Sequence, residues 1–204
     1  EKLYRDKCAQ GLRSIAVGWR ALPATAKDVG VADEADLVFA GFCLFVDPPK
    51  ETAAAAIKRL ESAGIRVKII SGDAAPTVQH LVETLKIPVR GLLTGADIAN
   101  LGDTALAHQV GKTDLFARVS PDQKTRIIRA LRAGGHTVGF VGDGINDAPA
   151  LHAADVGLAV ESATEVARAA ADMIMLESDL HVVHDAVEEG RRTYSNIMKY
   201  LRMG

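Results

Sequence analysis

The sequence predicts an α/β fold of the Rossmann-like, doubly wound kind, in which helices cover both faces of a parallel sheet. Short segments rich in β-branched residues alternate along the chain with longer segments that carry apolar residues at helical spacing. Glycines and capping residues separate the two kinds of segment. Two turns rich in Gly and Asp directly follow predicted strands, and ligands of such folds bind at the carboxyl ends of the strands.

The first part of the chain departs from this alternation. Residues 4–11 are predicted to form a helix and residues 14–19 a strand. A polar loop over residues 23–36 then precedes an apolar run over residues 37–46. We therefore expect residues 1–36 to be the end of a neighbouring domain together with its linker.

The main α/β domain is expected over residues 37–179, and a long terminal helix is expected within residues 180–204. In these two segments, helices are predicted over residues 51–63, 76–86, 120–133, 148–153, 164–170 and 180–202, and strands over residues 65–70, 115–118, 137–141, 156–160 and 173–176.

Helix boundaries are marked by recognisable residues. Gly64 ends the first of these helices, as glycine commonly does. Pro76 suits the first turn of the next helix, where its missing N–H is not needed. Ser120 and Gln123 fit a capping box, with Pro121 between them in the first turn.

The composition is that of a globular chain and excludes some partners. Of the 204 residues, 48% are hydrophobic and 25% are charged. The formal net charge of −2 gives no sign of a nucleic-acid surface or a polybasic membrane patch. Cys8 and Cys43 lie in apolar surroundings, so both are expected to be buried free thiols. His181 and His184 are expected to be surface residues rather than metal ligands.

No apolar run is long enough to cross a bilayer. The best candidate, residues 37–46, has about half the length that a spanning helix needs. The chain opens at Glu1 without an initiator methionine and ends at Gly204. We expect it to be a piece of a longer polypeptide.

The densest cluster of polar residues lies in the segment from Gly142 to Pro149 (GDGINDAP). Asp143 and Asp147 stand four residues apart with Asn146 between them, directly after a predicted strand. Carboxylates suit Mg²⁺, which binds through one or two of them together with phosphate and water. The alternative is a solvated turn in which Asp147 caps the next helix. A simple turn does not need so many Gly, Asn and Asp residues, which favours the metal site.

Three other features carry weaker signals. The hydroxyl of Ser71 and the amide of Gly72 follow a strand and could bind phosphate, but Ser-Gly-Asp is also an ordinary turn sequence. Lys124 offers a point charge for a phosphoryl group, but a lysine in a first helical turn is usually only solvated. Asp47, followed by paired prolines, suits a rigid hinge or a helix start as well as a functional role.

Taken together and in this order, these motifs resemble the P-type ATPases of the haloacid dehalogenase superfamily. The resemblance covers nearly the whole chain, and its most specific part is the segment from Gly142 to Pro149. The flanking residues 47–56 and 190–200 are most similar to the magnesium-transporting bacterial subgroup.

The resemblance implies roles for individual residues. Asp143 would ligate the catalytic Mg²⁺ with support from Asp147. The phosphoryl group would be contacted by side chains of Lys124, Ser71 and Asn146, and by the amide of Gly72. Lys124 would neutralise charge as the phosphoryl group transfers.

The resemblance also implies a nucleotide site. Arg13 lies in a segment similar to the end of a nucleotide-binding domain and would reach the phosphates of ATP. Asp73 and Asp47 would lie near the nucleotide or the hinge. Two positions depart from the family pattern. Ser71 stands where threonine is usual and keeps the hydroxyl, whereas Ala74 stands where asparagine is usual and loses a polar contact.

The resemblance further implies a parent protein that lies in the plasma (inner) membrane and couples ATP hydrolysis, through an aspartyl-phosphate, to transport of a cation. This segment would be soluble on the cytoplasmic side. The family's phosphorylated Asp lies in an Asp-Lys-Thr-Gly sequence on the central strand, and that sequence is absent here. We therefore expect this chain neither to autophosphorylate nor to hydrolyse ATP alone, and to self-associate or rearrange through its open sheet.

Two rival functions remain open. A freestanding phosphatase of the same superfamily would need an Asp-x-Asp nucleophile, which the residues before Ser71 do not contain. A non-catalytic module that binds Mg²⁺ or nucleotide would need only the turn around Asp143.

Overall fold

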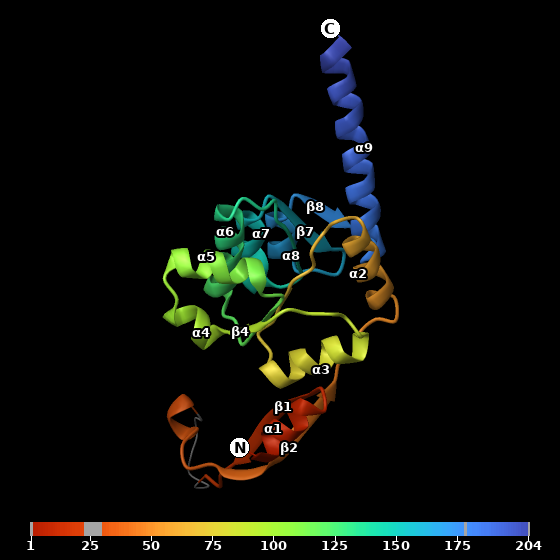
Figure 1. The fold of residues 1–204 in the computed structure, drawn as a ribbon. Helices are drawn as coiled ribbons and strands as arrows, with labels where there is room; N and C mark the ends of the chain where they lie inside the picture. Colours follow the sequence, from red (N-terminus) through yellow and green to blue (C-terminus); the bar gives the residue numbers. More distant parts are fainter. Residues whose placement is uncertain (1, 23–29, 178, 204) are drawn as a thin grey trace.

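The computed structural model describes residues 2–22, 30–177 and 179–203, and it confirms the α/β class. Three parts follow one another in Figure 1. A two-stranded ribbon with a short helix, α1 (Lys2–Ala9), lies at the amino-terminal end. A body of strands and helices forms the middle, and α9 (His181–Met203) projects from that body. Among the described residues, no helix is both long enough and apolar enough for a membrane span.

The ribbon consists of β1 (Leu12–Trp19) and β2 (Val38–Val46), which pair antiparallel. Between them the described part of the expected loop contains one 3-10 turn, η1 (Val31–Asp33), while residues 23–29 lie outside the described residues. The pairing runs across residue 36, where the sequence suggested a boundary. Most ribbon side chains are exposed, so the ribbon has no hydrophobic core of its own.

The parallel strands form two three-stranded sheets instead of the single sheet that the sequence suggested. One sheet has the order β3 (Ile69–Ile70), β5 (Leu115–Ala117), β4 (Leu92–Thr94). The other has the order β6 (Gly139–Gly142), β7 (Val156–Val160), β8 (Met173–Met175). β3 and β6 are therefore both edge strands, each hydrogen-bonded to one neighbour among the described strands.

A shared core holds the two sheets together. Ile70 of β3, Phe116 of β5 and Phe140 of β6 all pack into one hydrophobic cluster, with Ile127 and Ile128 of α6 at its centre. The remaining helices of the body are α2 (Ala53–Ser62), α3 (Ala75–Leu85), α4 (Gly95–Asn100), α5 (Asp103–Lys112), α6 (Pro121–Ala133), α7 (Ala148–Ala153) and α8 (Glu165–Ala170).

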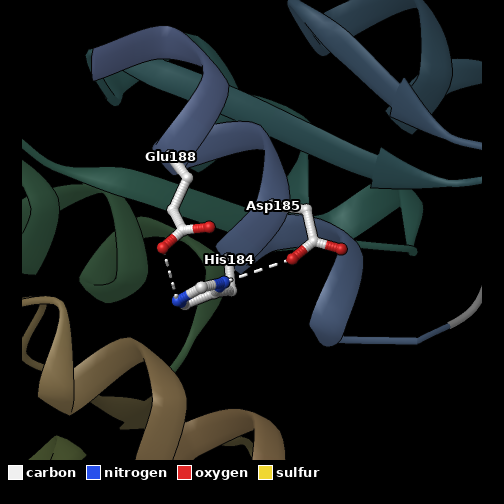
Figure 2. Close-up of side chains that lie close together, drawn as sticks. All are labelled: His184, Asp185 and Glu188. Atoms are coloured by element: carbon white, nitrogen blue, oxygen red, sulfur yellow. Dashed lines mark hydrogen bonds and ion pairs between the residues drawn. The ribbon is translucent and has the colours of Figure 1, made fainter. Parts of the chain in front are cut away.

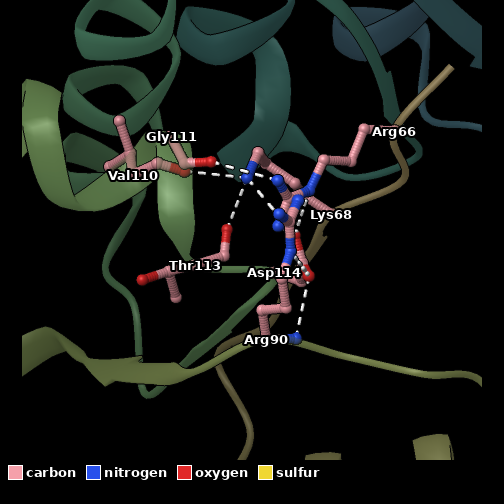
Figure 3. A network of polar contacts seen from close by, with 7 residues as sticks. All are labelled: Arg66, Lys68, Arg90, Val110, Gly111, Thr113 and Asp114. Carbon is pink, nitrogen blue, oxygen red and sulfur yellow. Dashed lines mark hydrogen bonds and ion pairs between the residues drawn. The ribbon is translucent and has the colours of Figure 1, made fainter. Parts of the chain in front are cut away.

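A buried carboxylate fixes the amino-terminal ends of the first sheet. Asp114, which immediately precedes β5, is 6% exposed and accepts contacts from Arg66, Lys68 and Arg90 (Figure 3). The Lys68 ammonium also donates to the carbonyl oxygens of Val110 and Thr113. Residues 65–68 were predicted to be part of a strand, yet the strand begins only at residue 69 because these side chains bind the loop before β5.

Several expectations from the sequence are corrected here. Cys8 is buried as expected, but Cys43 is exposed because β2 lies in the uncovered ribbon. His184 is not a surface residue: its imidazole is buried between α9 and α2. The segment from 87 to 114 gave no sequence prediction, and it contains β4, α4 and α5.

Candidate functional site

The segment from Gly142 to Pro149 forms a tight turn after β6. The chain makes a 3-10 turn over Ile145–Asp147, called η2, and passes directly into α7. A Cβ atom on Gly142 would lie 2.6 Å from Cβ of Asp147, so the close approach of these residues requires glycine. The Asp147 side chain does not cap α7. One of its oxygens, Oδ2, instead accepts the Gly144 N–H at 3.3 Å and closes the turn itself.

Lys124 and Asp147 form a close ion pair across two elements. The Lys124 ammonium donates to Oδ1 of Asp147 at 2.6 Å, and the two side chains are only 17% and 10% exposed. The predicted capping box of Ser120 and Gln123 is confirmed and fixes the first turn of α6, where Lys124 lies. A lysine in a first turn is disfavoured by the helix dipole, and here the buried carboxylate offsets that effect. The structure therefore speaks against the alternative of a merely solvated lysine.

Asp143 and Asn146 point to solvent on the outside of the same turn. The backbone carbonyl of Asp143 accepts the N–H of Thr164 at 2.9 Å, which ties the turn to the start of α8. The turn thus combines an exposed carboxylate, an exposed amide and a lysine-paired carboxylate. These are hard oxygen donors beside a positive charge, the set that suits Mg²⁺ with a phosphoryl group.

The second polar turn, after β3, is stabilised from within. The Ser71 hydroxyl donates to Oδ2 of Asp73 at 2.9 Å and accepts the Asp73 N–H at 3.0 Å. Gly72 between them is exposed, and a Cβ there would meet only ordinary contacts. An oxyanion at this turn would have to replace Asp73 as the partner of the hydroxyl.

Arg13 reaches this turn from the ribbon. Its Nε lies 3.2 Å from Oδ1 of Asp73, and both side chains are partly exposed, at 61% and 36%. Asp47, at the end of the ribbon, is exposed. The structure therefore brings Arg13, Ser71 and Asp73 together in one group, and Lys124 and Asp147, with Asp143 in the same turn, in another.

Backbone hydrogen bonds join the two groups. The N–H of Arg118 donates to the carbonyl of Asp73 at 2.8 Å, and the N–H of Val119 donates to the carbonyl of Ser71 at 3.1 Å. The loop that makes these bonds continues into α6, which carries Lys124 to Asp147. The carboxyl ends of β3, β5 and β6 therefore lie on one side of the body.

The sequence did not single out Arg118. Its φ is 52°, in the left-handed region that non-glycine residues seldom adopt. Its side chain is exposed at the end of β5, beside the Ser71 turn. Strained residues of this kind often occur at functional sites, so Arg118, whose backbone N–H binds the carbonyl of Asp73, is considered together with the candidate site. The chain carried no local signal for this conformation, because it follows from contacts with Asp73.

Comparisons with known proteins agree with the motifs. A family model described as haloacid dehalogenase-like hydrolase matches residues 9–155. The chain is 48% identical over 194 residues to a magnesium-transporting ATPase, P-type 1, of Salmonella typhimurium, and 47% identical over 194 residues to the corresponding protein of Escherichia coli K12. These matches confirm the resemblance to P-type ATPases of the magnesium-transporting kind. They cover 95% of this chain but only 22% of those proteins.

More distant similarities point the same way. A probable cation-transporting ATPase F of Mycobacterium tuberculosis is 40% identical over 204 residues, again across 22% of its length. A solved structure of the catalytic domain of the CPx-ATPase CopB-B superposes with a TM-score of 0.54 and 25% identity. That match covers 74% of this chain and 52% of the other one.

Proposed function

Because the chain belongs to the haloacid dehalogenase-like hydrolase family, we propose that it is the phosphoryl-handling segment of a P-type cation-transporting ATPase that transports Mg²⁺. The parent protein would couple ATP hydrolysis to ion translocation through an aspartyl-phosphate. The observation that carries the proposal is the ion pair between Lys124 and Asp147 inside the turn after β6. It combines, in one largely buried place, the cation and the carboxylate that phosphoryl transfer requires.

Each residue of the site would have a distinct role. Asp143, whose carboxylate faces solvent, would be the main Mg²⁺ ligand, with Asp147 as its support. The ion would neutralise phosphate charge when bound. Lys124 would stay beside Asp147 and offer its remaining N–H groups to the phosphoryl oxygens. The Asn146 amide, the Ser71 hydroxyl and the Gly72 N–H would orient the same oxygens.

The ribbon would contribute to nucleotide binding. Arg13 already faces the Ser71 turn through Asp73, and its guanidinium would bind the phosphates of ATP there. Asp73 and Asp47 would lie at the nucleotide or at the hinge. In this division, residues 1–36 end the nucleotide-binding domain, residues 37–179 form the phosphorylation domain and residues 180–204 lead towards the membrane on the cytoplasmic side.

The phosphorylated Asp is proposed to lie on a strand that this chain does not contain. Two features support this. The sequence Asp-Lys-Thr-Gly does not occur, and β3 and β6 are both edge strands whose carboxyl-end turns carry the site. A strand between them would join the two sheets and place its Asp between the Ser71 turn and Asp143.

The test uses two measurements on this chain. Calorimetric titration with Mg²⁺ in the presence of orthophosphate should show binding that Asp143→Asn weakens about tenfold or more, as expected for loss of a metal ligand. Asp6→Asn, which removes an exposed carboxylate on α1, is the matched control and should bind as the wild type does. Equal binding by both variants would overturn the assignment of Asp143.

The second measurement separates the proposal from its rivals. Incubation with labelled ATP should give no acid-stable, hydroxylamine-sensitive phosphoprotein, whereas a freestanding phosphatase would hydrolyse a simple phosphate ester. ATP titration of Arg13→Ala, compared with Arg129→Ala on the exposed face of α6, should show weaker ATP binding only for Arg13→Ala. Unchanged ATP binding would favour a module that binds only the metal.

A further inference from the structure

A cluster of charged and titratable side chains, none of which belongs to the site described above, joins α2 to the first turns of α9. Arg59 of α2 makes three contacts to α9. Its Nη1 lies 3.1 Å from Nδ1 of His181, and its Nη2 lies 3.0 Å from both Nδ1 of His184 and Oδ1 of Asp185. His184 is 6% exposed, although Arg59 and Asp185 are largely open to solvent.

These contacts fix where the protons are. A guanidinium can only donate hydrogen bonds, so Nδ1 of His181 and Nδ1 of His184 must both accept. In this arrangement both contacts require a neutral ring that carries its proton on Nε2. A carboxylate can only accept, yet Oδ1 of Asp185 lies 3.2 Å from the same Nδ1 of His184. Without a proton that nitrogen can accept from Arg59, and with a proton it can donate to Asp185, but it cannot do both at once.

Glu188 offers His184 a second partner on the same helix. Its Oε1 lies 3.7 Å from Nε2 of His184, one helical turn further along α9. Figure 2 shows the imidazole between the two carboxylates, with Asp185 on one ring nitrogen and Glu188 on the other. Ligand atoms of His184, Asp185 and Glu188 lie within 4.8 Å of one another. A cation at Nδ1 would nevertheless meet the guanidinium of Arg59, which already contacts that nitrogen.

We propose that His184 is a proton-operated switch at the junction of α2 and α9. In the neutral ring, Nδ1 accepts from Arg59 and ties the two helices together. In the protonated ring, Nδ1–H donates to Asp185 and Nε2–H donates to Glu188, so that His184 bonds only within α9 and its tie to α2 is lost. The proposal does not depend on the proposed function.

The charges around His184 favour different partners for its neutral and its protonated ring. From α2, Lys58 and Arg59 oppose a charged imidazole, and a protonated His181 would add to them. From α9, Asp185 and Glu188 favour the charged ring. Asp179, just before α9, accepts the N–H of His181 and faces that second ring.

Protons can reach the switch, and its effect is local. Lys58, Arg59, His184 and Glu188 line an open groove of about 400 Å³ between the helices. One turn further along, Arg191 donates to the carbonyl of Ala63 at 2.7 Å, and this tie contains no titrating histidine. Arg59 also keeps its ion pair with Asp185, so acidification should weaken the attachment of the first turns of α9 without abolishing it, and should leave the rest of the body unchanged. Histidine changes charge between about pH 5 and pH 8, which sets the window.

The tautomers can be observed directly on the unmodified chain. Imidazole ¹⁵N NMR at about pH 8 should show both His181 and His184 as the Nε2–H form. An Nδ1–H form of His184 at that pH would overturn the proposal, because Arg59 would then have no acceptor. This measurement needs no variant and so does not depend on how any substitution folds.

Hydrogen exchange then tests the mechanical consequence. After correction for the intrinsic effect of pH, amides in the first turns of α9 should exchange about tenfold faster at about pH 5 than at about pH 8, the scale of one charge-assisted hydrogen bond. His184→Asn keeps an acceptor near the position of Nδ1 but does not titrate, so its exchange should not respond to pH. His108→Asn, an exposed histidine on α5, is the control and should respond as the wild type does. A response that survives in His184→Asn would refute the switch.

Discussion

The Lys124 ammonium lies 2.6 Å from Oδ1 of Asp147, and this contact joins the helix after one sheet to the turn after the other. The other oxygen of the same carboxylate holds the Gly144 N–H, so one side chain both closes the turn and anchors the lysine. Because both groups are mostly buried, removal of either one would leave the other as a buried charge without a partner.

This dependence can be measured as a coupling energy. Lys124→Met should destabilise the chain by about 3 kcal/mol, since removal of one partner leaves a buried charge uncompensated. In an Asp147→Asn background the same substitution should have a much smaller effect. Urea unfolding of the two single variants and the double variant gives the cycle. Strictly additive effects would mean that the contact contributes nothing to the folded state.

A comparison of two aspartates tests the role of burial. Asp114→Asn should destabilise the chain by about 3 kcal/mol, because its carboxylate is 8% exposed and serves Arg66, Lys68 and Arg90. Asp103→Asn breaks an ion pair with Arg126, but the Asp103 side chain is 90% exposed, so the loss of stability should be about 0–1 kcal/mol. The two substitutions are chemically identical, and equal losses would contradict the assignment of Asp114 as the buried anchor of the first sheet.

Lys68 should make stability depend on pH in the alkaline range. Burial lowers the pKa of Lys68 below its ordinary value, and Asp114 only partly opposes this. Between the lowered pKa and the ordinary one, the unfolded chain binds more protons, so this residue makes the free energy of unfolding rise with pH up to the ordinary value. Lys68→Met should remove that contribution. The urea midpoints of the wild type and of Lys68→Met should be compared as the pH rises. A difference between the two midpoints that stays constant with pH would contradict the predicted contribution of Lys68.

The two edge strands should make the isolated chain prone to association. β3 and β6 each leave one row of backbone groups without a strand partner among the described residues, and Val141 of β6 is exposed. We expect a concentration-dependent shift in sedimentation, together with slower amide exchange in β6 at high concentration. Gly139→Pro, at the start of β6, should reduce this shift in sedimentation. An unmodified chain that stays strictly monomeric and whose amides are fully protected would contradict the predicted association.

The sequence was informative where the signal is local. The capping box at Ser120, the helix Ala148–Ala153 and the strand Val156–Val160 are all found as predicted, because their determinants lie within a few residues. It was silent over the segment that forms β4, α4 and α5. That region has short elements, and its start signal, the pair Thr94 and Asp97, went unnoticed.

The sequence also placed the polar turns after their strands, because the order of strands and turns along the chain follows from the residue pattern alone. It could not show that Lys124 is paired, that Asp147 closes its own turn, or that Arg118 adopts a left-handed conformation. The pairing of Lys124 depends on a partner 23 residues away, and the conformation of Arg118 depends on the turn at Asp73. The bond from Gly144 to Asp147 is local, but the sequence alone does not decide between this bond and capping of α7.

By itself, then, the sequence determined the α/β class and most helix and strand positions, and it supplied the residues that are proposed for the candidate site. Tertiary structure alone decided which charges are buried, which of them are paired, and that the strands form two sheets with β3 and β6 at their edges. The physical reason is range. Propensity, capping and periodicity act within one or two turns of chain, whereas burial and ion pairing depend on which distant segments the shared core brings together.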